Sequence, residues 1–138
     1  MRKLKIVLIL PSLAGGGAEK VMLSFIENID QNKYNIILIL QNKIGPLQTD
    51  LPSKNIINLN KKHFRIALPS LIKEIRKVKP DIIFSTFPHI TLPLLVIKNF
   101  FFAKSIFIAR EPNMIDFSFR HSFFLVLIKF FYGIFLHK

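Results

Sequence analysis

The chain has no cysteine and no tryptophan, and only eight of its 138 residues are acidic. Without cysteine it can form neither a disulfide nor a thiolate metal site, which is typical of proteins in a reducing compartment. The acidic residues are scattered and no Asp-x-Asp motif occurs, so no metal requirement is implied. We therefore expect no metal and no tightly bound cofactor.

Long hydrophobic runs are also missing. The apolar run near the N-terminus covers only residues 6–10, which is short for a signal peptide and suits a buried strand. Residues 123–136 are almost wholly apolar, but at roughly four turns they are too short to span a bilayer, and Lys129 interrupts them. We expect a cytoplasmic chain, peripheral at the inner face of the membrane if this segment lies on lipid. The segment otherwise packs under a partner domain or on the chain's own sheet.

Basic residues are plentiful: 20 Lys and Arg against 8 Asp and Glu give a formal charge of +12. Such a charge suits nucleic acid, an anionic membrane surface or a phosphorylated ligand. No basic run exceeds two residues, and no aromatic residues alternate with Lys or Arg as in single-strand binders. We therefore expect no nucleic-acid partner.

Five short, Ile-rich apolar segments alternate with helical patterns. Three of them are continuously apolar, as in strands buried on both faces, which favours a parallel sheet. Strand, helix, strand alternation indicates right-handed crossovers and a doubly wound, Rossmann-like α/β fold of about five strands in the order 3-2-1-4-5, with helices on both faces. We expect a single domain over residues 1–138. The five segments are residues 5–10, 35–40, 55–60, 81–86 and 105–110.

Two apolar stripes at helical spacing predict helices with one face toward the sheet. We expect the second helix to begin after a Ser70 cap. The first stripe consists of Val21, Met22, Phe25, Ile26 and Ile29, and the second of Leu71, Ile72, Ile75 and Val78.

Three consecutive glycines, Gly15, Gly16 and Gly17, separate the first strand from the first helix. In a doubly wound sheet this turn lies where the strand order reverses, which is the usual ligand site. Glycines there let the backbone approach a ligand, and the amides of a helix N-terminus favour phosphate or sugar hydroxyls. The dinucleotide pattern G-x-G-x-x-G and the phosphate-loop pattern G-x-x-x-x-G-K-[ST] are both absent. A simple tight turn is the structural alternative.

The segments "SLAGGGAEKVMLSF", "DIIFSTFPHITLPLL" and "IFIAREPNM" together resemble the N-terminal half of family 4 glycosyltransferases. These are retaining two-domain GT-B enzymes that move a sugar from a nucleotide sugar onto a glycan or lipid-linked acceptor, commonly in bacterial surface polysaccharide synthesis. The resemblance covers essentially the whole chain. It implies a nucleotide sugar as co-substrate and a second, donor-binding domain.

The resemblance also implies roles for individual residues. Gly15, Gly16 and Gly17 match the loop beside the acceptor and the donor phosphates, and Thr86 and His89 match the segment after the fourth strand. Arg110, Glu111 and Asn113 match the segment after the fifth strand. We take Glu111 and His89 as candidate catalytic residues, and the three glycines, Thr86, Arg110 and Asn113 as candidate substrate-binding residues. Structural roles for His89, Arg110 and Glu111 remain open.

The sequence departs from the family in two respects. Pro112 stands where many members carry a histidine, which puts that histidine's catalytic role in doubt here, although Glu111 would be placed to orient the acceptor hydroxyl. The family's donor-binding domain, with its pair of glutamates spaced eight apart, has no counterpart in the 138 residues. We expect the chain alone to have little or no transferase activity. A non-catalytic, membrane-associated binding module is the alternative, with Lys73, Arg76, Lys77 and Lys79 facing anionic lipid.

Overall fold

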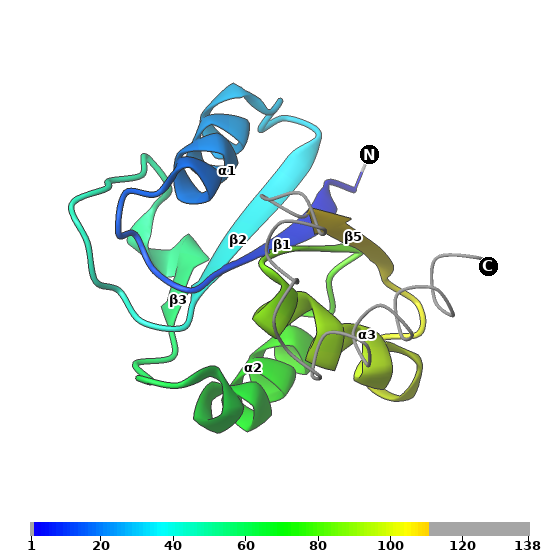
Figure 1. Cartoon of the computed structure of the whole chain (residues 1–138). Helices are drawn as coiled ribbons and strands as arrows, with labels where there is room; N and C mark the ends of the chain where they lie inside the picture. Colours follow the sequence, from blue (N-terminus) through cyan, green and yellow to red (C-terminus); the bar gives the residue numbers. More distant parts are fainter. Residues whose placement is uncertain (1, 111–138) are drawn as a thin grey trace.

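The computed structural model describes residues 2–110, which form one five-stranded sheet with helices on both faces (Figure 1). All strands are parallel, and their order is β3-β2-β1-β4-β5, which confirms the predicted order. The strands are β1 (Leu4–Leu10), β2 (Tyr34–Leu40), β3 (Ile56–Asn58), β4 (Ile82–Thr86) and β5 (Ile106–Arg110), and the helices are α1 (Gly17–Asn28), α2 (Phe64–Val78) and α3 (Pro88–Phe101), with a short 3-10 turn over Ser53–Asn55.

The central strand β1 organises the core. It pairs with β2 over seven residues, from Leu4 opposite Tyr34 to Leu10 opposite Leu40, and with β4 on its other side. Its residues 6–10 are buried, because alternate side chains enter two separate apolar clusters. The continuously apolar sequence is thus the expected signature of a strand covered on both faces.

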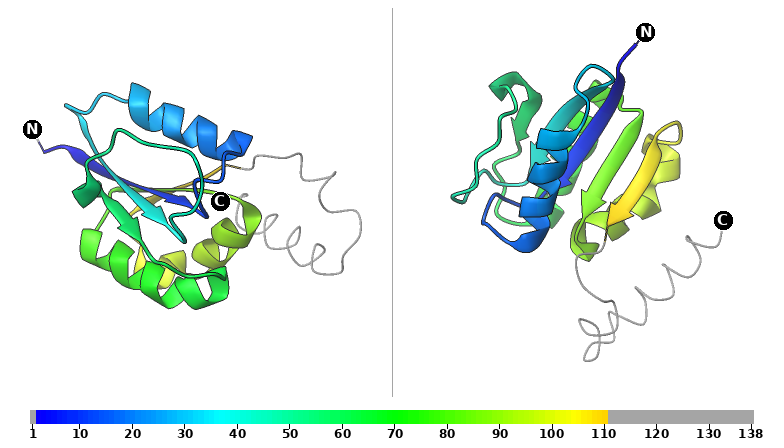
Figure 2. Two further views of the ribbon diagram at one scale, coloured as in Figure 1. Left: turned by 90° about the vertical axis from the view of Figure 1, so that its left-hand side faces the viewer. Right: turned by 90° about the horizontal axis from the view of Figure 1, so that it is seen from above.

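The helices are divided between the two faces of the sheet. Helix α1 packs on one face through Met22, Leu23 and Ile26, whereas α2 and α3 pack on the opposite face (Figure 2, left). The buried residues of the second face include Leu71 and Ile75 of α2 and Ile90 and Leu94 of α3. This distribution confirms the doubly wound α/β class.

Two details of the helices differ from the sequence-based expectation. Helix α2 begins at Phe64 with His63 at its N-cap, so Ser70 is an interior residue rather than a cap. The apolar stripe continues upstream through Ala67, which is fully buried, and Pro69 is accommodated within the helix. In α1 Leu23 is buried in place of Val21, which is 47% exposed, because the face toward the sheet is rotated by one position.

Helix α3 was not predicted as a helix, although its segment was singled out for its motif. Its signals are Pro88 at the first helical position, where the missing amide costs no hydrogen bond, and the buried positions Ile90, Thr91 and Leu94. Pro93 and several β-branched residues weaken the helical pattern in the sequence. Burial against the sheet overrides these local preferences.

Asp81 connects β1, β4 and β5 at the amino edge of the sheet. This edge is opposite the one where the loop with the three glycines, residues 15–17, lies; we call this loop the glycine loop. Its carboxylate accepts a hydrogen bond from the Lys5 amide at 2.8 Å and pairs with the Arg2 guanidinium. Its backbone bonds both Lys5 of β1 and Ile106 of β5. The Lys5 amide above all, aided by Arg2, holds the pKa of Asp81 below the usual 3.8, against an opposing effect of desolvation.

We expect Asp81→Asn to lower the urea midpoint of unfolding at pH 7. The asparagine side chain is uncharged, so it loses the ion pair with Arg2 and is a weaker acceptor for the Lys5 amide. A carboxyl with a lowered folded pKa stabilises the fold fully above the unfolded value of 3.8 and loses that effect as the pH falls through the folded pKa. The difference between variant and parent should therefore shrink below about pH 4. Asp50→Asn, at an exposed loop carboxylate, is the control; a pH-independent difference for Asp81→Asn would contradict the assignment.

Candidate functional site

The predicted site residues that the structure describes gather at the carboxyl edge of the sheet, around the reversal of strand order between β1 and β4. The glycine loop leaves the end of β1 and turns into α1, whose N-cap is Gly16. Gly15 has a φ of +101°, a conformation that strongly favours glycine. The loop is therefore in the position that the sequence predicted.

The fold requires glycine at some of the three positions of the loop and not at others. Gly15 needs its positive φ, and a Cβ on Gly16 would lie 2.5 Å from a carboxylate oxygen of Glu19. The Glu19 side chain, only 7% exposed, thus folds back against the loop at the first turn of α1, where the helix dipole favours a negative charge. A Cβ on Gly17 would meet nothing within 4 Å. Gly17 therefore borders open space that the fold itself does not require.

The backbone amides at the start of α1 directly follow the glycine loop. The first hydrogen bond of the helix runs from the Lys20 amide to the Gly16 carbonyl at 3.1 Å. The amides of Gly17, Ala18 and Glu19 precede that bond, so they have no acceptor within the helix. Such amides together with the helix dipole favour anionic or hydroxyl ligands.

The glycine loop is braced by the loop that follows β2. The Leu13 amide donates to the Ile44 carbonyl at 2.9 Å, and the Leu47 amide donates to the Leu13 carbonyl at 3.2 Å. Gly45, with a φ of +128°, packs so closely that an added Cβ would lie 2.0 Å from the Leu13 carbonyl oxygen. The sequence analysis missed Gly45, although the Gly45-Pro46 dipeptide is a turn signal.

Thr86 and Arg110 are two polar residues that lie next to each other at this edge. They are the last residues of β4 and β5 and lie directly opposite each other in the register. The Thr86 hydroxyl oxygen and one terminal guanidinium nitrogen of Arg110 are buried, and neither has a hydrogen-bond partner among residues 2–110. Between residues 2 and 110, no carboxylate forms an ion pair with Arg110. A buried polar group without a partner is unfavourable for the fold, so such groups normally bind a water molecule or a ligand group.

The two residues lie on the α1 side of the sheet. Phe84 and Ile108 line a cavity with Phe25 of α1, and Thr86 and Arg110 follow them by two residues on the same strands. Ser85 points to the opposite side, where its hydroxyl is 2.9 Å from that of Thr91 in α3. The buried Ser85–Thr91 bond anchors the end of β4 to the helix that follows it.

His89 lies on the other lip of the strand reversal, in the first turn of α3. Its ring is 5.8 Å from the Phe87 ring and 6.1 Å from the Phe64 ring, measured between centroids. Partial desolvation lowers the pKa of His89 from the usual 6.5, so the imidazole is neutral at neutral pH and able to accept a hydrogen bond from a hydroxyl. Phe87 holds a φ of +75°, which is strained for a non-glycine residue and is typical of functional loops.

The described part of the site thus contains Gly15, Gly16, Gly17, Thr86, His89 and Arg110 at one edge. The other two candidates, Glu111 and Asn113, lie outside the described residues. Within residues 2–110, no three His, Asp or Glu side chains come together in a way that would hold a metal ion. The same residues include no helix that is both long and apolar enough to cross a membrane.

Comparison with known proteins finds no matching family model and no matching curated protein. The interpretation of the site consequently depends on its own chemistry. That chemistry combines free helix-terminal amides, a buried hydroxyl and a partly buried guanidinium, with a neutral imidazole across the strand reversal.

The substitutions Gly45→Ala and Gly17→Ala compare a glycine that supports the glycine loop with a glycine that borders open space. We expect Gly45→Ala to destabilise the protein by about 2 kcal/mol or more, because the new Cβ meets the Leu13 carbonyl and the φ is unfavourable. Gly17→Ala should change the free energy of unfolding by less than about 1 kcal/mol, since its Cβ points into open space. Urea denaturation followed by circular dichroism measures both. Equal effects would contradict the proposed bracing.

Proposed function

We propose that the chain is the acceptor-side domain of a retaining GT-B glycosyltransferase. The enzyme would transfer a sugar from a nucleotide sugar to a glycan or lipid-linked acceptor in surface polysaccharide synthesis. The observation that carries the proposal is a pair of buried polar atoms on Thr86 and Arg110, which have no partner within the described residues and lie at the edge occupied by the glycine loop. The family resemblance of the three loop segments supports it.

The chemistry of the reaction fits these groups. As a glycosyl phosphate bond breaks, negative charge grows on the departing phosphate, and fixed cations and dipoles that meet this charge are the largest catalytic contribution. Arg110 supplies a cation, and the amides of Gly17, Ala18 and Glu19 supply oriented dipoles. The open space at Gly17 leaves room for a ligand atom close to the backbone.

The acceptor needs hydrogen-bonding groups rather than charge. The neutral imidazole of His89 and the hydroxyl of Thr86 each form hydrogen bonds suited to a sugar hydroxyl. In a retaining transfer the departing phosphate helps to deprotonate the acceptor hydroxyl, so His89 and Glu111 would orient that hydroxyl. The nucleotide itself would be held by a second domain, on this chain or on a separate polypeptide.

One observation favours a second candidate, a membrane-associated module without catalysis. The outer side of α2 exposes Lys73, Arg76 and Lys77, and Ile66 on the same helix is 59% exposed. Such a basic face with an apolar residue fits an anionic membrane surface. A peripheral location at the inner face of the membrane would serve either function, since lipid-linked acceptors are found there.

Binding is the first test of the proposal. We expect inorganic pyrophosphate and UDP- or GDP-hexoses to shift the NMR amide signals of Gly15, Gly16 and Gly17 saturably, with a dissociation constant near 1 mM because the second domain does not contribute. Gly17→Ala should remove these shifts while preserving stability. The absence of any response to these ligands would overturn the site. Binding to anionic liposomes without a nucleotide-sugar effect would favour the second candidate.

Thr86→Val tests whether the buried hydroxyl is kept for a ligand. Valine has nearly the same shape and no unpartnered hydroxyl, so we expect the free protein to be stabilised by about 1 kcal/mol while pyrophosphate or hexose nucleotide binds about tenfold more weakly. Thr91→Val is the matched control: it leaves Ser85 without its partner and should destabilise the fold without weakening binding. Loss of stability in Thr86→Val would mean that the hydroxyl serves the fold.

Transfer activity is the third test. We expect the 138-residue chain alone to move little or no sugar from UDP- or GDP-hexose donors to membrane lipid extracts, because most groups that hold the donor belong to the other domain of such enzymes. Radiolabel incorporated into the lipid fraction measures this transfer. Robust turnover by the purified chain would show that no second domain is needed and would overturn the two-domain assignment.

A further inference from the structure

The C-terminal end of α3 exposes large apolar side chains. Phe100 is 85% exposed, and Val96, one turn earlier, and Phe101 are 46% and 42% exposed. A helix that packs on a sheet normally carries polar residues on its outer side, so the core does not account for these three side chains. Contiguous exposed apolar surface of this kind is typical of a contact with a protein or a membrane.

The neighbouring helix α2 brings positive charge to the same surface. The two helices lie side by side on one face of the sheet (Figure 1), and the Arg76 guanidinium lies over the Phe101 ring, 5.8 Å from its centroid. Lys73 shares a face of α2 with Arg76, because residues three apart in a helix are neighbours. Within residues 2–110, no carboxylate forms an ion pair with either side chain. We call Lys73, Arg76, Val96, Phe100 and Phe101 the basic aromatic patch.

We propose that the basic aromatic patch binds the surface of an anionic lipid bilayer. Apolar and aromatic side chains enter the boundary between headgroups and acyl chains, while adjoining Lys and Arg side chains attract anionic headgroups. Arg76 meets both requirements, since its guanidinium is held against an apolar ring and its planar donors match a phosphate group. Phe100, the most exposed side chain, is then the one that enters the bilayer.

Charge favours lipid over a second copy of this chain. In a two-fold symmetric dimer the patch would contact itself, so Lys73 and Arg76 would approach their own counterparts. The whole chain carries a formal charge of +12, which adds to this repulsion. An anionic bilayer instead presents negative charge over its entire surface and attracts basic residues along it.

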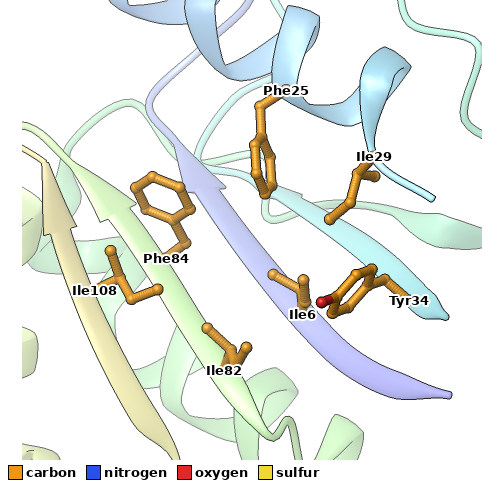
Figure 3. Close-up of a pocket in the computed structure, with 7 residues that line it drawn as sticks. All are labelled: Ile6, Phe25, Ile29, Tyr34, Ile82, Phe84 and Ile108. Atoms are coloured by element: carbon orange, nitrogen blue, oxygen red, sulfur yellow. The ribbon is translucent and has the colours of Figure 1, made fainter. Parts of the chain in front are cut away.

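A second apolar surface of the chain lacks such charge. The cavity lined by Phe25, Phe84 and Ile108 forms an apolar trough of about 310 Å³ beside α1 (Figure 3). Its lining residues include no Lys or Arg, and the Tyr34 hydroxyl is the only polar atom among the side chains that line it. The trough therefore offers no attraction to anionic headgroups, and lipid charge distinguishes it from the basic aromatic patch.

Binding through this patch leaves the candidate site accessible. The chain passes from the end of α3 into β5 at the amino edge of the sheet, so Phe100 lies toward the edge opposite the glycine loop. The seven-residue strand β1 extends roughly 23 Å between these two edges. The inference assigns the membrane location considered above to particular side chains, and it does not rest on the transferase assignment.

The absence of tryptophan makes a direct test simple. Phe100→Trp in the full chain places a single indole in the patch, and Val21→Trp places one at a 47% exposed position on α1 as the control. We expect phosphatidylcholine vesicles with about one-third phosphatidylserine to shift the emission of Phe100→Trp to shorter wavelength and to leave Val21→Trp unchanged. Pure phosphatidylcholine, or about 1 M salt, should weaken this binding about tenfold or more.

Cosedimentation with the same vesicles tests the individual contributions. We expect Phe100→Ser and Lys73→Gln each to weaken vesicle binding by about fivefold or more. Val21→Ser and Lys43→Gln, at exposed positions on α1 and in the loop after β2, are the matched controls and should leave binding unchanged. Circular dichroism verifies folding of each variant. The amide shifts caused by pyrophosphate should persist in Phe100→Ser, so a failure of membrane binding is distinguishable from a failure of the candidate site.

Other outcomes overturn the proposal. Equal binding by Phe100→Ser and the parent chain would show that lipid contacts another surface, and selective loss of binding in Ile108→Ser would assign the contact to the apolar trough. Short-wavelength emission of Phe100→Trp in the free protein, unchanged by vesicles, would mean that the patch is already covered. A shift caused by poly-glutamate but not by vesicles would assign the patch to an acidic protein partner.

Discussion

The rest of the structure depends on the burial of β1 between two parallel neighbours and two apolar layers. Parallel pairing with both β2 and β4 brings the carboxyl ends of the three strands to one edge, and burial on both faces fixes the register, since a shift of one residue would exchange the two apolar clusters. The glycine loop, Thr86 and Arg110 lie at the same edge of the sheet for this reason, although they are far apart in sequence. The site is thus a consequence of strand order.

The carboxyl edge of the sheet combines a rigid loop with open space and unpaired polar groups. The loop around Gly15 is fixed by backbone bonds to residues 44–47 and by close packing of Gly45, so its position does not depend on a ligand. In contrast, Gly17 borders open space, and Thr86 and Arg110 hold buried polar atoms that no other described residue pairs with. A preorganised loop with unsatisfied groups is what a binding site requires, because the ordering cost is met during folding and the hydrogen bonds remain available.

The sequence predicted the strands well because their signal is strong. Short Ile-rich runs permit little other than buried parallel strands, and the five predicted segments agree with the observed ones within one or two residues, apart from the shorter β3. The start of α2 was wrong because Pro69 and Ser70 imitate a helix start, whereas burial of Ala67 extends the helix upstream. Gly45-Pro46 signals a turn, but the close packing of Gly45 on Leu13 and the neutral state of His89 depend on contacts between distant segments, which no local pattern contains.

The polar end and the apolar trough of the α1 side are parts of one surface. Along β4 and β5 the residues facing α1 change from Ile82 and Ile106 through Phe84 and Ile108 to Thr86 and Arg110, so the polar pair lies at the carboxyl end of the apolar strip. The apolar side chains next to the pair lower the local dielectric constant on one side of the Arg110 guanidinium, which strengthens its attraction for an anion. The apolar strip that belongs to the core thus also affects the electrostatics of the candidate site, which gives the fold and the proposed function a common requirement.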